Sequence, residues 1–398
     1  MRDLKHNIRY YITGNVGILL LTWLLYAIGN SITMPYLSIY MKMLGANAFE
    51  IGTAYSIAMA SQLITIIPGG YLTDTIGRRM SIVTGTWIIT ATSFLMAIAP
   101  NWQLLTVIYA LNSAAAYYQP ALLAIILDSL PPERYASGIL VTSVLPQIPW
   151  LILPPVGGLL INKYGLLGIR IAYLISASIS TIVAIIRQLS LRETLNNALR
   201  KPSLRELLYS YYSLGRITQI PREVLRIYVM ALILAIALMP INTLLPIYVV
   251  YKLGLSTVYW GSLVSISYAA YIVLSIAITF YVDRFRSKLI MWGTVLGLIG
   301  SVAGLLEDVP SVIVYLLLLQ VGSQLLMTAL QSRLGDLIGI NRRGHGVSLL
   351  IVFQLIGQMV GSYLSGSLYR LSTYTLFLIP LISISILLGL QLTERFNK

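Results

Sequence analysis

The stretch Gly70-Tyr71-Leu72-Thr73-Asp74-Thr75-Ile76-Gly77-Arg78-Arg79 lies between two long apolar runs and decides how the whole chain is interpreted. A partial copy, Tyr281-Val282-Asp283-Arg284-Phe285-Arg286-Ser287-Lys288, follows in the second half, with its aspartate 209 residues further on. The repeat is wider than this loop, because the spacings of 7 and 22 residues that separate Gly45, Gly52 and Asp74 also separate Gly254, Gly261 and Asp283. The chain therefore consists of two related halves.

The composition places both halves in a membrane. The chain has 398 residues, of which 57% are hydrophobic and only 10% are charged, whereas a soluble domain carries about 25% charged residues. The apolar residues form blocks close to the ~20 residues that a helix needs to span a bilayer. Twelve blocks are predicted, at 15–41, 49–70, 79–99, 102–130, 137–161, 168–188, 224–251, 257–281, 287–306, 309–333, 346–369 and 373–392. The first is too long for a cleaved signal peptide.

We therefore predict an all-α membrane protein with twelve transmembrane helices in two pseudo-symmetric six-helix bundles. Residues 1–187 and 224–398 form the bundles, and 188–223 form a cytoplasmic linker with a helix that starts after Ser203. Two interpretations of that helix stay open: it lies along the inner membrane surface, or it only spaces the halves. Helix breaks are expected in spans one, five and seven at these prolines: Pro35, Pro146, Pro149, Pro154, Pro155 and Pro246.

The distribution of basic residues predicts the orientation. The net charge is +14, from 27 basic and 13 acidic residues. With the N-terminus in the cytoplasm, only Lys42, Lys163, Arg170, Lys252 and Arg370 fall outside, so 22 of the 27 lie inside, as the positive-inside rule requires. We expect a multi-pass protein of the cell membrane with both termini cytoplasmic, whose basic residues meet anionic lipid and not nucleic acid. The absence of cysteine excludes disulfides and thiolate chemistry.

The loop of the opening stretch resembles the signature of the major facilitator superfamily, Gly-x-Leu-x-Asp-Arg-x-Gly-Arg-Arg/Lys. Gly70, Leu72, Asp74, Gly77, Arg78 and Arg79 match, and Thr75 departs from it. In span five, Pro154, Gly157 and Gly158 are similar to the Gly-Pro-x-x-Gly-Gly pattern of the family's antiporters, with Leu153 in place of the first glycine. The resemblance implies six plus six spans around a central cavity.

It also implies a set of gating residues at the cytoplasmic ends of the spans. Asp74 is expected to act as a latch against the start of span eleven, at Gly344 to Val347; the alternative is that it only caps a turn. Arg78 is expected to pair with Asp128, and a basic residue of 284–288 with Asp336. The gating candidates are Gly70, Asp74, Gly77, Arg78, Asp128, Arg134, Asp283, Arg284 and Asp336.

The spans contain neutral polar residues in place of charges. None of the acidic residues lies in the middle of a span, so the proton-coupling candidates are at span ends: Glu50, Asp128 and Asp336. Amides and one tryptophan are the candidates for a cavity that suits a neutral or amphipathic molecule, although amides also join helices. The substrate-binding candidates are Asn30, Asn112, Gln119, Gln147, Trp150, Asn242, Gln320, Gln324, Gln354 and Gln358.

The predicted function is secondary transport of a small organic molecule by alternating access. Export of drug-like or metabolite compounds is favoured, and coupling to protons is left open. The alternatives are uptake or facilitated transport of a neutral solute such as a sugar, a channel, and, in another class, a membrane-embedded enzyme. Both histidines, His6 and His345, lie outside the spans, which argues against an enzyme. We expect a monomer without cofactor or metal. Its expected partners are the substrate, membrane lipid and, if transport is coupled to them, protons.

Overall fold

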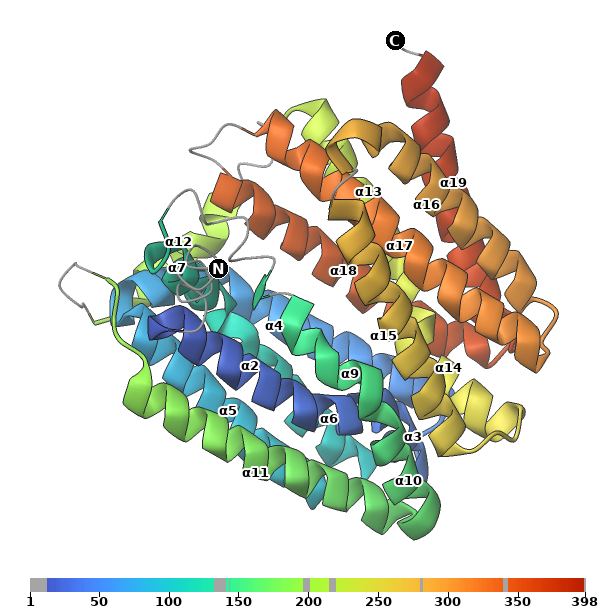
Figure 1. The fold of residues 1–398 in the computed structure, drawn as a ribbon, viewed down its shortest axis with the longest axis horizontal. Helices are drawn as coiled ribbons and strands as arrows, with labels where there is room; N and C mark the ends of the chain where they lie inside the picture. Colours follow the sequence, from blue (N-terminus) through green and yellow to red (C-terminus); the bar gives the residue numbers. More distant parts are fainter. Residues whose placement is uncertain are drawn as a thin grey trace, which may run out of the picture. The chain divides into compact units, whose positions relative to one another are not determined.

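The computed structural model describes residues 13–131, 141–142, 144–195, 201–214, 220–279, 282–338 and 343–396. In this part of the chain all regular secondary structure is helical and no strand is formed (Figure 1). The predicted all-α class is confirmed. The backbone packs as two compact units, one of Met1–Leu37 with Ser61–Thr218 and the other of Ser38–Ala60 with Gln219–Lys398.

The predicted transmembrane blocks correspond to helices of suitable length. Within the described ranges, eleven helices are long and apolar enough to cross a membrane, and the remaining block corresponds to a shorter apolar helix, Lys288–Gly304. A helix pairs most of its backbone donors and acceptors internally, as hydrocarbon demands. The chain is therefore a multi-pass membrane protein.

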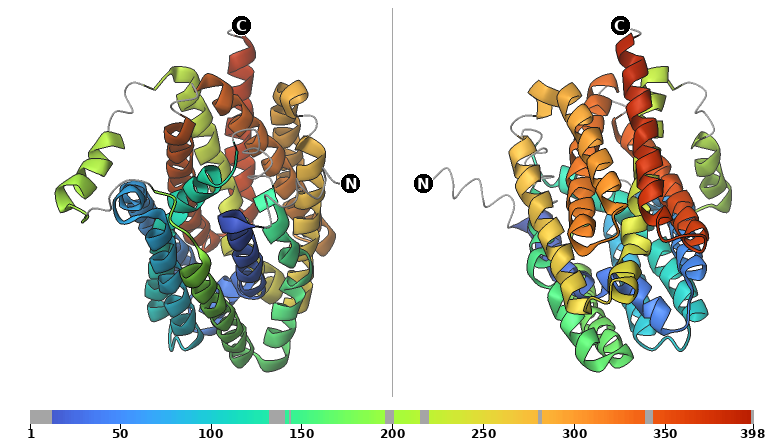
Figure 2. Two further views of the ribbon diagram at one scale, coloured as in Figure 1. Left: turned by 60° about the vertical axis from the view of Figure 1, so that its left-hand side comes forward. Right: turned by 90° about the vertical axis from the view of Figure 1, so that its right-hand side faces the viewer.

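The first unit contains the helices of the N-terminal half, except for a segment that packs with the second unit. Within it, α11 lies beside both α2 and α5 (Figure 2). Its elements are α2 (Gly14–Thr33), η1 (Met34–Tyr36), the second part of α4 (Ala48–Ile76), α5 (Arg78–Ala97), α6 (Trp102–Ala114), η2 (Ala115–Tyr118), α7 (Gln119–Asp128), η4 (Leu145–Gln147), α9 (Ile148–Ile152), α10 (Pro154–Tyr164), α11 (Leu166–Ser190) and α12 (Leu204–Leu214).

The second unit contains the C-terminal half and the segment Ser38–Ala60. In it, α16 packs along α17, and α13 packs against α18 and α19. Its elements are most of α3 (Leu37–Met43), the first part of α4, α13 (Arg222–Thr243), α14 (Leu245–Ile247), the π-helix η6 (Tyr248–Lys252), α15 (Thr257–Thr279), α16 (Val282–Gly304), α17 (Val309–Leu337), α18 (Arg343–Tyr369) and α19 (Thr375–Phe396). The prediction of bundles at 1–187 and 224–398 did not include the grouping of Ser38–Ala60 with the second half.

Prolines interrupt the helices where the sequence predicts breaks. Span one changes to a 3-10 turn at Met34–Tyr36, span five is divided into η4, α9 and α10, and span seven ends in α14 and a π-helical turn. Span four is also interrupted, by η2 just before Pro120, which was not predicted. Proline lacks an N–H and clashes with the preceding turn, so each break frees carbonyl groups for other partners.

One carbonyl in the first turn of α10 and one glycine join α10 to span one. The Tyr36 hydroxyl donates to the Pro154 carbonyl at 2.5 Å. A Cβ on Gly157 would lie 2.3 Å from the Ile32 carbonyl oxygen, so only glycine fits this crossing. The small residues of the Pro-Pro-Val-Gly-Gly stretch thus permit close helix contact, as expected.

The linker helix begins where the sequence predicts. Helix α12 starts after Ser203, whose carbonyl accepts from Leu207 N–H. Two hydrogen bonds tie it to α4: Ser203 N–H donates to the Tyr71 hydroxyl at 2.8 Å, and the Tyr211 hydroxyl donates to the Ile64 carbonyl at 2.5 Å. Leu208 is exposed, and the placement of α12 along the membrane surface stays a prediction.

Two adjacent glycines in α4 have opposite environments. A Cβ on Gly69 would meet the Tyr117 carbonyl oxygen at 2.2 Å, whereas one on Gly70 would meet nothing within 4 Å. Gly70, the residue of the loop signature, lies inside α4 without a close neighbour, and Gly69 makes the contact.

We expect Gly69→Ala to destabilise the protein by about 1–3 kcal/mol, because the methyl group forces two backbones apart. Gly70→Ala is the matched control and should be neutral or stabilising by up to about 1 kcal/mol, since alanine is the better helix former. Thermal unfolding of the two detergent-purified variants measures the difference. Equal melting temperatures would contradict the packing.

Candidate functional site

The loop of the opening sequence forms a sharp turn at Gly77. Helix α4 ends at Ile76, and α5 begins at Arg78. Between them Gly77 has φ 96°, a conformation that side chains other than glycine rarely adopt. No side chain at the N-cap position accepts a hydrogen bond from the first amides of α5, so their acceptor must come from elsewhere in the chain.

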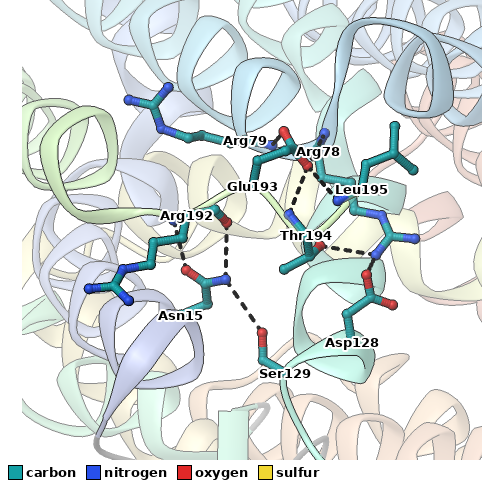
Figure 3. A network of polar contacts seen from close by, with 9 residues as sticks. All are labelled: Asn15, Arg78, Arg79, Asp128, Ser129, Arg192, Glu193, Thr194 and Leu195. Atoms are coloured by element: carbon teal, nitrogen blue, oxygen red, sulfur yellow. Dashed lines mark hydrogen bonds and ion pairs between the residues drawn. The ribbon is translucent and has the colours of Figure 1, made fainter. Parts of the chain in front are cut away.

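That partner is Glu193, in the segment that follows α11. Its carboxylate accepts hydrogen bonds from the backbone N–H of Arg78 at 3.2 Å and of Arg79 at 3.0 Å (Figure 3). The same carboxylate accepts from the N–H of Thr194 and of Leu195. An anion at a helix N-terminus is favoured by the free amides and by the helix dipole.

The Arg78 side chain joins this segment to span four. Its guanidinium forms an ion pair with Asp128, in the last turn of α7, and donates to the Thr194 hydroxyl at 3.1 Å. The predicted Arg78–Asp128 pair is therefore present. Three parts of the chain that are far apart in sequence meet at one arginine.

Asn15, near the start of α2, completes the network. Its amide accepts from Arg192 N–H at 2.9 Å and donates to the Arg192 carbonyl at 3.1 Å. It also donates to the Ser129 hydroxyl at 3.4 Å. Below this layer lies the hydrophobic core of the unit, which includes Val16, Leu19, Ile82, Ile125 and Leu191. The loop network thus joins spans one, three and four to the segment after span six at one end of the bundle.

Asp74 does not take part in this network. Its side chain is exposed, and among the described residues of its own unit it has no hydrogen bond or ion pair. The interpretation of Asp74 as the cap of the following amides is wrong, because Glu193 fills that role. Its role as a latch against span eleven stays a prediction.

Other gating candidates lie at helix ends. Asp336 is in the last turn of α17 and is exposed. Asp283 and Arg284 belong to the first turn of α16, which departs from helical geometry at Phe285, but their side chains lie outside the described part. Arg134 lies outside the described residues altogether.

Four of the proposed substrate-binding amides bond within their own unit. Asn112 donates to the Thr92 hydroxyl at 2.7 Å, and Gln324 to the Ser275 hydroxyl at 3.2 Å. Gln354 donates to the Met327 sulfur at 3.6 Å, and Asn242 to the Leu238 carbonyl of its own helix at 3.4 Å. These contacts favour the interpretation of these amides as joints between or within helices.

The remaining candidates have fewer such ties. Asn30 lies one turn after Tyr26 on α2, and both are half-buried. Gln119 is exposed at the start of α7, and Gln147 and Trp150 are half-buried in the interrupted fifth span. Gln320 and Gln358 are half-buried, and no side-chain hydrogen bond of theirs is found among the described residues. Asn30, Gln119, Gln320 and Gln358 are the amides most available to a ligand.

Glu50 has a structural partner. It accepts from Asn47 N–H at 2.7 Å, while the Asn47 side chain accepts from Glu50 N–H at 3.1 Å. This reciprocal pair is a capping box at the start of α4, and the spacing of three residues is its sequence signal. Proton carriage by Glu50 stays a prediction.

A clasp of close contacts joins the start of α4 to the end of α18 within the second unit. Arg370 stacks over the Phe49 ring at 4.1 Å and donates to the Asn47 side chain at 3.3 Å. A Cβ on Gly52 would lie 2.6 Å from both the Gly366 Cα and the Ser362 carbonyl oxygen, and one on Gly366 would lie 2.8 Å from the Gly52 Cα. We call these residues, with Tyr363 packed edge-on against Phe49, the outer clasp, after the predicted orientation.

Arg187 is a buried polar residue that is not among the site residues predicted from the sequence. It lies one turn before the end of α11 and is only 2% exposed. Its guanidinium donates to the Thr22 hydroxyl at 3.1 Å and to the Thr86 hydroxyl at 2.9 Å. The available signal was an arginine near the end of the block at 168–188, whose other charged residue, Arg170, lies at its start.

The comparisons with known proteins identify the family. The model of the Major Facilitator Superfamily matches residues 19–262 and again 227–395. The chain therefore belongs to the Major Facilitator Superfamily, a class of membrane transporters.

Several curated proteins are similar to part of the chain. The "Multidrug resistance protein MdtG" of Enterobacter lignolyticus is 28% identical over 229 residues, which cover 55% of this chain and 52% of that protein. The "Multi-drug resistance efflux pump PmrA homolog" of Lactococcus lactis is 29% identical over 237 residues, 54% of this chain and 58% of that protein. The chain thus spans about half the length of these relatives.

Solved structures confirm the fold. The nucleoside transporter NupG has a TM-score of 0.74 at 13% identity, covering 94% of this chain and 98% of its own. A POT family transporter in complex with 5-aminolevulinic acid has a TM-score of 0.76 at 14% identity, covering 96% and 95%. The predicted transporter fold is correct.

We expect Glu193→Gln to lower the free energy of unfolding by roughly 0.5–1 kcal/mol, because it removes the charge at the start of α5 in an exposed, screened position. Glu206→Gln is the control, since Glu206 is also exposed and belongs to the same linker. Thermal unfolding at low ionic strength measures both. The same melting temperature for the two variants would argue against the capping role.

The outer clasp gives a second prediction. Gly52→Val should separate α4 from α18, because its side chain would overlap the Gly366 backbone. Ser362 is fully buried, so Ser362→Cys provides a single thiol in this cysteine-free chain. We expect Gly52→Val to increase the rate of maleimide labelling at that thiol several-fold. Gly389→Val is the control, because a Cβ there meets nothing within 4 Å; an unchanged rate with Gly52→Val would show that α4 and α18 tolerate the side chain.

Proposed function

We propose that this protein is a secondary transporter that exports small drug-like or metabolite molecules across the cell membrane by alternating access. The observation that carries the proposal is the family match over both halves of the chain, together with the intact loop network around Arg78, Asp128 and Glu193. Export is supported by the names of two similar proteins, which are a multidrug resistance protein and an efflux pump.

The loop network is proposed to keep one end of the first bundle rigid during transport. Arg78 joins spans three and four, and Glu193 joins span three to the segment after span six. An exposed ion pair contributes only about 0–1 kcal/mol by itself, yet this is sufficient to bias two states that differ by a few kcal/mol. Asp74, which has no tie in its own unit, is then available as the latch in one state of the cycle.

The bound molecule is proposed to contact the amides that are not engaged elsewhere: Asn30, Gln119, Gln320 and Gln358. Neutral amides both donate and accept hydrogen bonds, so they suit molecules with carbonyl, hydroxyl or amine groups. Asn112, Gln324 and Gln354 are proposed to contribute less to ligand binding than the sequence predicts, because each has a partner within its unit.

Energy coupling is proposed to depend on a carboxylate at a span end. Glu50 is held in a capping box and Asp128 in an ion pair, so each would have to leave its partner to carry a proton. Both termini and the 188–223 linker are proposed to be cytoplasmic, on the distribution of basic residues.

The experiment is transport in proteoliposomes that contain the purified full chain. A panel of fluorescent drug-like compounds is tested with and without an imposed pH gradient, and Asp74→Asn is compared with the wild type. We expect transport of some members by the wild type and a loss of at least about tenfold in Asp74→Asn, since the latch acts only in the cycle. Binding in detergent should be unchanged by Asp74→Asn. Uptake of a sugar with no effect on any drug-like compound would contradict the proposal.

A further inference from the structure

Among the described residues, no acidic side chain bonds to the buried charge of Arg187. Its two hydrogen-bond acceptors are the hydroxyls of Thr22 and Thr86, which are neutral. Helix α11 and the helices packed on it, α2, α5 and α10, contain no Asp or Glu. Arginine stays protonated in proteins, so the charge of Arg187 persists in an apolar setting.

The charge is not needed for the helix contact that Arg187 makes. The second half of the chain contains a corresponding contact between α19 and α16, where Gln391 donates to the Thr294 hydroxyl at 2.6 Å. Thr86 and Thr294 are 208 residues apart, the offset of the repeat in this region, and Arg187 and Gln391 are 204 apart. Both threonines also donate to the carbonyl four residues before them, Ile82 and Ile290. A neutral amide therefore makes, in the other half, the contact that corresponds to the bond between Arg187 and Thr86.

Burial of an unpaired cation is unfavourable, and ionisable groups inside a membrane are usually functional. The end of α11 offsets part of the cost, because a helix C-terminus favours a cation. The rest of the burial cost indicates that the charge itself has a role, which the neutral glutamine of the other half could not fill.

The groups near Arg187 indicate that role. Thr22, Tyr26 and Asn30 are spaced four residues apart and so lie along one face of α2. Tyr26 lies one helical turn from Thr22, whose hydroxyl accepts a hydrogen bond from the Arg187 guanidinium. The stripe runs from the fully buried Thr22 to the half-buried Tyr26 and Asn30. A molecule in contact with Tyr26 or Asn30 would therefore experience the positive potential of Arg187 through a medium of low dielectric constant.

We propose that Arg187 determines the charge preference of the transporter: it favours organic molecules that carry an anionic group beside Tyr26 and Asn30, and it disfavours organic cations. This deepens the proposed function and rests on it. Arg187 does not touch the ligand in this proposal, since it is 2% exposed; it acts through its field as a specificity-determining residue.

The test uses matched aromatic compounds of equal size: naphthoate, its neutral amide naphthamide, and naphthylmethylammonium. Their binding to the purified full chain is measured by thermal shift and calorimetry. We expect the wild type to bind the carboxylate and the amide in preference to the ammonium compound. Arg187→Gln should reduce the ratio of carboxylate to ammonium affinity by about tenfold, which corresponds to about 1.4 kcal/mol.

Two further variants separate charge from structure. Arg187→Lys keeps the charge and should keep the preference. Arg170→Gln removes a cation from the same helix at a distant position, where it donates to the Ala99 carbonyl, and should leave the ratio unchanged. A merely structural role would change stability in Arg187→Gln but leave the ratio as it is, and this result would overturn the proposal.

The wild type alone also tests the proposal, if Arg187→Gln does not fold. Equal or tighter binding of the ammonium compound by the wild type would overturn the charge preference, while transport of drug-like molecules could still hold. If instead neither these compounds nor any drug-like panel member binds, the proposed function fails together with the inference. The two failures are therefore distinguishable.

Discussion

The hydrocarbon of a bilayer offers no hydrogen bonds, so every polar group within a span must find its partner inside the protein. In this chain the partner is repeatedly a threonine. Arg187, Asn112 and Gln391 each donate to a threonine hydroxyl on a neighbouring helix. Each of those hydroxyls in turn donates to a carbonyl of its own helix, one turn earlier. A hydroxyl can donate and accept at once, so threonine connects a long polar side chain to a helix backbone and leaves neither unsatisfied. The same device occurs in both halves.

The same constraint explains where helices break. A proline inside a span frees carbonyls that lipid cannot satisfy, and the breaks at η1 and before α10 are accordingly brought together. Tyr36, in the first break, donates to the carbonyl of Pro154, in the second. The close approach depends on Gly157, where a side chain would overlap the Ile32 carbonyl. Gly157 therefore lets span one come near enough for Tyr36, in the first break, to bond to the first turn of α10.

The fold could be predicted because length, apolar composition and the internal repeat are properties of the sequence alone. The Arg78–Asp128 pair could also be predicted, since the topology of spans two to four brings both residues to one end of the bundle. Glu193 could not, because its position depends on how the chain turns after α11. Gly69 and Gly70 differ only in the phase of one helix, which the loop signature does not determine. The hydrogen bond of Asn112 could not be predicted either, because its acceptor, Thr92, lies twenty positions earlier on another helix. The sequence therefore placed Asn112 among the cavity candidates. The Asn47–Glu50 capping box, by contrast, was readable from its spacing.

The two halves share a geometry and differ in charge, and this difference bears on how such a chain can acquire specificity. Duplication supplies two copies of a helix contact, each of which needs one donor and one hydroxyl. Because a neutral amide is sufficient, as Gln391 shows, the other copy is free to carry a charge without loss of the contact. The cost is limited to burial of the cation, and the position near a helix C-terminus reduces it. The membrane makes polar contacts between helices obligatory. At these contacts a transporter of this fold can therefore change the electrostatic potential of its interior while its packing stays the same.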